Sequence, residues 1–173
     1  MSAAKAIVYF AHGKESGPWG SKIKYLADVA TAHGYAVASP DYSHTHNPKA
    51  RVQQLLDLNP QAERLILAGS SMGGYVSAMA CTALHPCALF LMAPAFYFDE
   101  YPEEPGDCPA DTVVVHGWND DVVPPERAIR FAQARYARLH LVDDGHRLEH
   151  SLDFLGDVFA AQLQRHTAST THS

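Results

Sequence analysis

The pentapeptide Gly69-Ser70-Ser71-Met72-Gly73 follows directly on the apolar run Arg64-Leu-Ile-Leu-Ala68. Together they predict a strand, a G-x-S-x-G turn and a helix, which is the setting of a nucleophilic serine at Ser71. Such a turn strains the backbone, and side chains two residues before and after the serine would collide, so glycine suits both positions. The amide N–H of Met72 would stand at the helix start, where unpaired N–H groups and the helix dipole favour negative charge.

Composition restricts the classes of protein to consider. The 173 residues are 47% hydrophobic and 18% charged, which is typical of a globular chain, and we expect a single domain over 1–166 with a frayed polar tail at 167–173. The net charge of −6 without a Lys/Arg-rich run argues against a nucleic-acid partner. Three cysteines without CxxC spacing fit a reducing cytoplasm, and neither a signal peptide nor a membrane span is expected. The oligomeric state stays unpredicted.

Short apolar runs alternate with helical patterns along the whole chain. Several runs are apolar on both faces, as expected for parallel strands that helices cover on both sides. The pattern predicts a doubly wound α/β fold with about six mostly parallel strands. We predict strands at 6–11, 36–40, 64–69, 88–93, 112–116 and 139–142, and helical segments around 23–30, 52–56, 72–84, 126–136 and 151–165.

The connection 94–109 interrupts this rhythm, because it carries too many prolines for a regular helix. It follows a strand end, where ligands sit in open α/β sheets. Two interpretations stay open: an exposed acidic linker, or a short lid whose aromatic side chains, among them Phe96 and Tyr97, line a pocket.

A G-x-S-x-G turn alone is a weak signal, since a serine hydroxyl needs a base, and the base needs an orienting acid. The run 113–115 leads into a loop that carries Asp120 and Asp121, and the last predicted strand leads into a loop that carries His146. Serine, acid and histidine therefore follow successive strands in the order of the α/β-hydrolase triad. Asp120 is the preferred acid, with Asp121 as the alternative.

Three blocks of sequence extend this similarity. They are His12-Gly-x-x-Ser16-x-Pro18-x-x-x-Lys22, then Gly69-Ser-Ser-Met-Gly-Gly-Tyr75, and then the Asp and Gly-His loops. With these blocks the chain resembles the α/β-hydrolase superfamily, and within it the small YqiA-type bacterial esterases. The resemblance covers nearly the whole chain, but the first two strands of larger members are missing and the cap is reduced to the loop 94–109.

The resemblance implies a role for each matching residue. It makes Ser71 the nucleophile, His146 the base and Asp120 the acid of an HG-x-x-D-x-x-V-P pattern. The backbone N–H groups of Lys14 and Met72 would form the oxyanion hole.

Further residues near these motifs allow two interpretations each. Trp19 and Trp118 lie beside the oxyanion loop and the acid loop, where they would act as packing anchors or as substrate contacts. His44 and His46 suggest a metal site, but no third ligand follows at a useful spacing, so we predict neither metal nor cofactor.

These observations predict a serine hydrolase, specifically a carboxylesterase that cleaves small acyl esters. A thioesterase, including one that removes acyl groups from proteins, uses the same chemistry and is the main alternative. A binding protein that retains the fold without catalysis is the alternative from another class.

Overall fold

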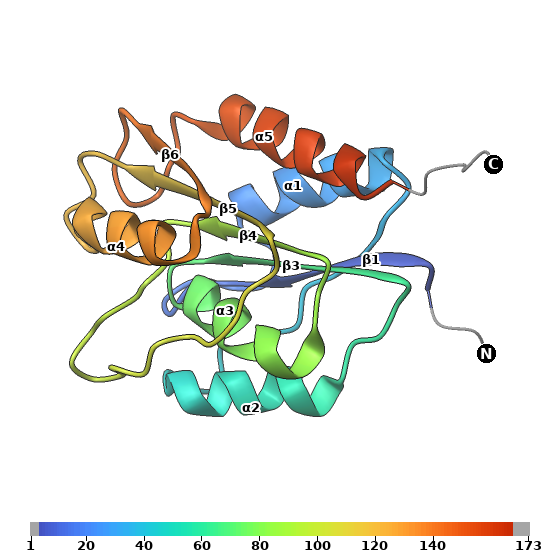
Figure 1. The fold of residues 1–173 in the computed structure, drawn as a ribbon, viewed down its shortest axis with the longest axis horizontal. Coiled ribbons are helices and arrows are strands. Elements are labelled where there is room, and N and C mark those ends of the chain that lie inside the picture. Colours follow the sequence, from blue (N-terminus) through green and yellow to red (C-terminus); the bar gives the residue numbers. More distant parts are fainter. Residues whose placement is uncertain (1–3, 168–173) are drawn as a thin grey trace.

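The computed structural model describes residues 4–167 and contains one six-stranded sheet in which all strands are parallel (Figure 1). The strand order is β2-β1-β3-β4-β5-β6. Predicted and observed strands agree to within two residues at each end. The strands are β1 (Ala6–Ala11), β2 (Ala36–Ala38), β3 (Arg64–Ser70), β4 (Ala88–Met92), β5 (Asp111–Gly117) and β6 (Arg138–Val142).

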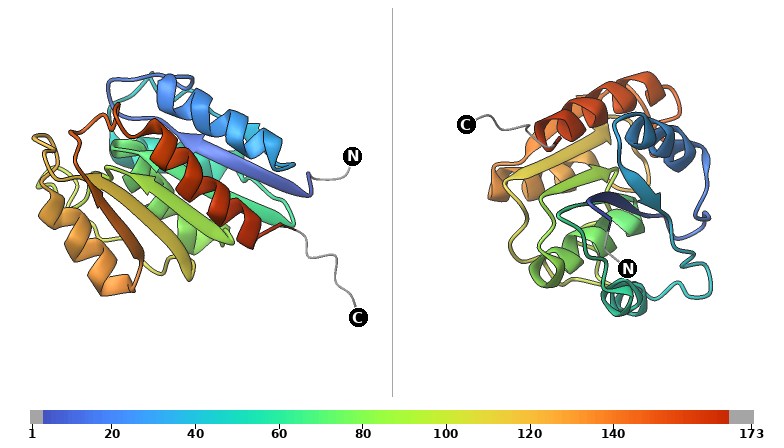
Figure 2. Two further views of the ribbon diagram at one scale, coloured as in Figure 1. Left: turned by 90° about the horizontal axis from the view of Figure 1, so that it is seen from above. Right: turned by 90° about the vertical axis from the view of Figure 1, so that its right-hand side faces the viewer.

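Within residues 4–167, five helices cover the two faces of the sheet. Helices α1 and α5 lie together on one face, and α2, α3 and α4 lie on the other (Figures 1 and 2). The predicted fold class, a small α/β sheet with helices on both faces, is therefore confirmed. The helices are α1 (Ser21–Ala32), α2 (Pro48–Leu58), α3 (Met72–Leu84), α4 (Pro125–Arg135) and α5 (Leu152–Arg165).

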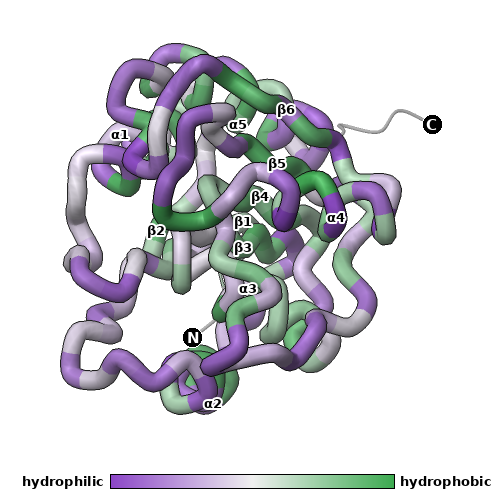
Figure 3. The backbone as a smooth tube through the Cα atoms, turned by 90° about the vertical axis from the view of Figure 1, so that its left-hand side faces the viewer, coloured by the Kyte–Doolittle hydropathy of each residue, from purple (hydrophilic) through white to green (hydrophobic). Residues whose placement is uncertain are grey.

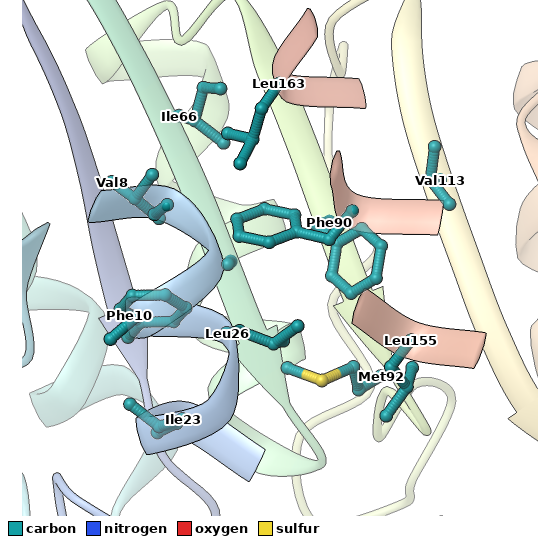
Figure 4. Close-up of a cluster of buried hydrophobic side chains, with 14 of the residues drawn as sticks. Val8, Phe10, Ile23, Leu26, Ile66, Phe90, Met92, Val113, Leu155 and Leu163 are labelled. Carbon is teal, nitrogen blue, oxygen red and sulfur yellow. The ribbon is translucent and has the colours of Figure 1, made fainter. Parts of the chain in front are cut away.

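Alternation along the strands divides the core into two layers. In β3, Leu65 and Leu67 pack against α2 and α3, whereas Ile66 and Ala68 point to the layer under α1 and α5. Successive side chains of a strand point to opposite faces, so a strand that is covered on both sides must be apolar throughout. Figure 4 shows the second layer, in which Phe90 of β4 lies among Leu26 of α1 and Leu155 and Leu163 of α5.

The strand order puts a topological switch point between the ends of β1 and β3. The chain leaves β1 through α1 on one face and leaves β3 through α3 on the other. Ligands of open α/β sheets bind at such a switch point, beyond the carboxyl ends of the strands. Figure 3 looks onto this edge, where the hydrophobic strands end among largely hydrophilic connections.

Two sequence-based expectations concern membrane spans and the C-terminal tail. Between residues 4 and 167, no helix combines the length and the apolar character that crossing a membrane requires. The predicted frayed tail starts at 167, two residues after the end of α5, and the structure ties Thr167 to that helix, because its Oγ1 donates to Leu163 O at 3.0 Å. The remainder of that tail, 168–173, lies outside the described residues.

Candidate active site

Ser71 occupies the turn between β3 and α3 with φ 54° and ψ −119°, a conformation that side-chain-bearing residues rarely adopt. Neighbouring backbone groups hold the turn in place. Ser71 N–H donates to Met92 O at 2.9 Å, and Ser71 O accepts from Ala95 N at 3.0 Å. Strained backbone persists only where the surrounding structure enforces it. The predicted strain at Ser71 is confirmed, and the end of β4 supports it.

The two glycines of the motif are required by packing. A Cβ atom on Gly69 would lie 2.1 Å from Gly73 O, and one on Gly73 would lie 1.9 Å from Ala11 O at the end of β1. Both distances are far below any real contact of a Cβ atom. The first turn of α3 can therefore approach β1 and β3 only if both positions lack a side chain.

Three side chains from different loops form one hydrogen-bonded line. His146 Nε2 lies 3.0 Å from Ser71 Oγ, and His146 Nδ1 lies 2.8 Å from Asp120 Oδ2. A carboxylate only accepts hydrogen bonds, so Nδ1 carries the proton and Nε2 of a neutral ring faces the hydroxyl as an acceptor. Asp120 is buried, whereas Asp121 is exposed. The structure thus brings Asp120 and not Asp121 to the histidine.

The carboxylate of Asp120 is held on both oxygens. Oδ1 accepts from the backbone N–H groups of Val122 and Val123 at 2.9 and 2.7 Å. Oδ2 lies 3.2 Å from His116 Nε2 in addition to its bond with His146. Burial by itself would raise the pKa of Asp120, but these hydrogen bonds, led by His116 and His146, outweigh it and hold the pKa well below its usual range. The group is an anion at neutral pH.

His116 is a second histidine on this carboxylate. It is completely buried, and its Nε2 lies 2.8 Å from Val123 O as well as 3.2 Å from Asp120 Oδ2. Both neighbours are acceptors, so Nε2 carries the proton. His116 is the penultimate residue of β5, and nothing in the sequence pattern reveals its contact with Asp120.

Asp144 shapes the loop that presents His146. Its Oδ1 accepts from Gly145 N at 2.8 Å, and its Oδ2 accepts from His150 N at 2.9 Å and from Ser151 Oγ at 2.8 Å. Burial alone would raise the pKa of Asp144, but these hydrogen bonds lower it overall. The buried carboxylate of Asp144 thus binds both ends of the segment 144–151 and fixes the loop that carries His146.

Met72 and the segment Gly13–Lys14, which the sequence predicts to form the oxyanion hole, both adjoin Ser71. Met72 is the first residue of α3, and a Cβ atom on Gly13 would lie 3.5 Å from Ser71 Cβ, which places the segment next to Lys14 against the serine. Over residues 4–167, the hydrogen bonds of the structure include none donated by the backbone N–H of Lys14 or Met72.

A buried arginine that sequence reasoning missed anchors the loop after β1. Arg51 of α2 has no exposed surface and donates to Gly13 O at 3.0 Å, to Lys14 O at 3.2 Å and to Thr45 O at 2.7 Å. One signal was present in the sequence, because Arg51 stands one helical turn before the buried Leu55. A charged residue on the apolar face of a helix indicates a specific polar partner.

The four candidate pocket residues divide into three kinds. Trp19 and Trp118 are 45% and 55% exposed, so each presents about half of its surface to solvent and both interpretations of their role stay open. The prediction that Phe96 lines a pocket is wrong. Its side chain is 1% exposed and stacks on Phe131 with ring centroids 4.1 Å apart, so it belongs to the core. Tyr97 is half-buried beneath Arg130, whose guanidinium carbon lies 3.8 Å from the ring centroid.

The loop 94–109 crosses the outside of the helices α2, α3 and α4. Its Tyr101 ring meets Tyr75 of α3 edge-on at 4.9 Å, and Arg127 of α4 lies 4.4 Å from the Phe98 ring. Further along the loop, Glu103 forms an ion pair with Lys49 of α2 at 2.8 Å. Near its start, the backbone N–H of Ala95 donates to Ser71 O at 3.0 Å.

Residues 4–167 contain no group of three or more His, Cys, Asp or Glu side chains that could hold a metal ion.

A family model covers more than half of the chain. Residues 6–107, from β1 into the loop after β4, match the model of the uncharacterised protein family UPF0227. The chain belongs to UPF0227. The comparison with curated proteins finds no match.

Solved structures place this UPF0227 chain in the α/β-hydrolase superfamily, which confirms the resemblance seen in the sequence. A protein from Xanthomonas campestris pv. campestris that was assigned to this superfamily is 36% identical over 92% of this chain and 99% of its own, with a TM-score of 0.85. Est1E from Butyrivibrio proteoclasticus is 17% identical over 97% and 90%, with a TM-score of 0.82. XC6422 from Xanthomonas campestris, described as an a/b serine hydrolase without lid, is 22% identical over 98% and 86%, with a TM-score of 0.68.

Proposed function

We propose that the protein is a cytoplasmic serine carboxylesterase that cleaves small acyl esters through an acyl-enzyme on Ser71. The observation that carries the proposal is the line from Ser71 Oγ through His146 to Asp120, with distances of 3.0 and 2.8 Å. Removal of the hydroxyl proton by an oriented imidazole turns a weak nucleophile into an effective one.

The reaction proceeds in two halves. As Ser71 Oγ attacks the ester carbonyl carbon, His146 Nε2 takes its proton, and Asp120 stabilises the imidazolium. The carbonyl oxygen becomes an oxyanion that the N–H groups of Lys14 and Met72 bind. When the intermediate collapses, the C–O bond to the alcohol breaks and His146 returns the proton to the alcohol. Water then attacks the acyl-enzyme with His146 as base, which releases the acid and restores Ser71.

Two further observations favour an ester of modest size. Est1E, which has the same fold, has a structure with bound ferulic acid, a small carboxylic acid. The large aromatic rings of Trp19 and Trp118, on the loops after β1 and β5, are exposed to solvent and available to a small acyl or alcohol group.

A substrate series tests this proposal. We expect wild-type protein to hydrolyse p-nitrophenyl esters from acetate to octanoate, with the highest kcat/KM for short chains. Ser71→Ala should lower kcat by roughly 10⁴-fold or more, whereas Ser70→Ala, the matched neighbour, should stay within a few-fold of wild type. Matched acyl thioesters in the same series decide between an esterase and a thioesterase. A folded wild type that turns over neither class would refute the proposed function.

A further inference from the structure

The peptide group between Gly13 and Lys14 is anchored at its carbonyl end by several donors at once. Gly13 O lies 3.0 Å from Arg51 Nη1 and 2.8 Å from His12 Nδ1. The hydroxyl and the backbone N–H of Ser16 add weaker contacts at 3.3 and 3.4 Å. A carbonyl oxygen has two lone pairs, which Arg51 and His12 occupy with the two short contacts. The two longer contacts from Ser16 further restrict the direction of the C=O bond.

The direction of this carbonyl determines the direction of the Lys14 N–H. In a trans peptide the C=O and the N–H point to opposite sides of one rigid plane, and the described chain contains no cis peptide bond. Because Gly13 O faces Arg51, the Lys14 N–H faces away from it. Gly13 itself lies against Ser71, so that side is the one where an oxyanion on a Ser71 adduct would form.

The guanidinium of Arg51 is bound by backbone carbonyls. Its guanidinium donates to four backbone carbonyls, those of His12, Gly13, Lys14 and Thr45, at 3.4, 3.0, 3.2 and 2.7 Å. Within residues 4–167 the ion pairs do not include Arg51. Burial lowers the pKa of Arg51, yet arginine stays charged in proteins. A full positive charge therefore lies directly behind the Gly13–Lys14 peptide.

His12 completes the anchor in its neutral form. Its Nε2 accepts from Tyr42 N at 2.9 Å, so the proton is on Nδ1, which donates to Gly13 O. Burial lowers the pKa of His12, which favours this neutral state.

We propose that Arg51 is a positioning residue of the oxyanion hole, which aims the Lys14 N–H at the oxyanion and strengthens it as a donor. The inference rests on the proposed function. The strengthening has a physical cause: a cation bound at the carbonyl end polarises the peptide and makes its N–H more positive, because linked hydrogen bonds polarise one another. A donor that is fixed before the reaction also needs no reorganisation in the transition state.

The test compares Arg51→Gln with the control Arg135→Gln. Arg135 is a partly buried arginine of α4 that donates to Pro105 O at 2.5 Å, away from Ser71. Arg51→Gln should lower kcat on p-nitrophenyl acetate about 10- to 100-fold, with KM changed less than threefold. Its affinity for a trifluoromethyl ketone, which forms an oxyanion on Ser71, should fall by the same factor as kcat/KM. Arg135→Gln should keep kcat within about twofold of wild type.

A double-mutant cycle with Lys14→Pro separates positioning from general destabilisation. Proline removes the N–H through which Arg51 acts, so Arg51→Gln should cost less than threefold in the Lys14→Pro background. Costs that multiply in the double variant would overturn the inference. If Arg51→Gln fails to fold, Arg51→Lys, which keeps the charge, replaces it in the same cycle. A wild type without hydrolysis refutes the proposed function, whereas an active wild type with kcat unchanged in the Arg51 variant refutes only this inference.

Discussion

The loops at the carboxyl edge of the sheet are held in two different ways. The three site loops, 12–16 after β1, 117–124 after β5 and 143–151 after β6, are fixed by buried polar side chains that bind backbone groups, namely Arg51, Asp120 and Asp144. The loop 94–109 after β4 relies more on aromatic and cation–π contacts with α3 and α4, to which Arg135 adds a hydrogen bond to Pro105 O and Lys49 an ion pair with Glu103. Directional bonds define the position of an atom closely, whereas ring contacts mainly contribute burial. The comparison predicts that changes in the three site loops lower kcat. Changes in the loop 94–109 should lower the free energy of unfolding but leave kcat unchanged.

The largest effect should come from the acid of the second site loop. Asp120→Asn keeps the size of the side chain but removes the charge that orients and stabilises a protonated His146, so kcat should fall by roughly 10⁴-fold. Asp121→Asn, one residue away and exposed, should retain kcat. Steady-state kinetics on p-nitrophenyl acetate check both, and the reverse result would move the acid to Asp121.

A smaller effect on kcat is expected at His116, whose Nε2 lies 3.2 Å from Asp120 Oδ2. His116→Leu removes the Nε2–H donor at Asp120 Oδ2, so kcat should fall about tenfold. His116→Gln restores an amide donor of similar reach and should recover most of that loss. The pH dependence of kcat/KM in all three proteins supplies the second readout. If His116→Gln is no better than His116→Leu, His116 only fills space.

The charge of Asp144 in the third site loop should make the free energy of unfolding depend on pH in the acid range. A carboxyl group whose folded pKa is lowered stabilises the protein fully above its unfolded pKa of about 4 and loses this contribution as pH falls through the folded value. Asp144→Asn should therefore lower the free energy of unfolding by about 1–3 kcal/mol at pH 7, and by less at pH 3. Urea denaturation at both pH values measures the difference. An equal loss at pH 7 and pH 3 would show that the charge of Asp144 is not involved.

The smallest effect should come from the loop 94–109. Arg127→Gln removes the guanidinium over Phe98 and should cost about 0.5–1 kcal/mol in stability, while kcat on p-nitrophenyl acetate stays at the wild-type value. Thermal unfolding and kinetics on the same samples give both numbers. A fall in kcat without a fall in stability would show that this loop takes part in catalysis, contrary to the comparison.

Most of the fold was accessible from the sequence because it depends on local patterns. The run at Arg64 is apolar on both faces and must be a covered strand, and the collision argument for Gly69 and Gly73 needs only the motif. The approach of Ser71, Asp120 and His146 also followed from their order after parallel strands, since such strands end at one edge.

The remaining features depend on contacts between distant segments, which no local pattern encodes. Arg51 is 37 residues from Lys14, whose carbonyl it binds, and nothing in helix periodicity shows what a buried guanidinium will meet. The lid interpretation of the loop 94–109 predicts that Phe96 lines a pocket, because an aromatic side chain in a proline-rich loop after a strand end is typical of a lid. Its ring instead reaches Phe131 of α4 and completes the core there.

The central claim is that Ser71 attacks a carbonyl, and labelling of the intact protein with a fluorophosphonate probe tests it most directly. The probe phosphonylates an activated serine, and peptide mass spectrometry locates the adduct. We predict a single adduct on Ser71 that disappears in Ser71→Ala and is strongly reduced in Asp120→Asn. Folded wild-type protein that stays unlabelled, or an adduct on any other serine, would contradict the account.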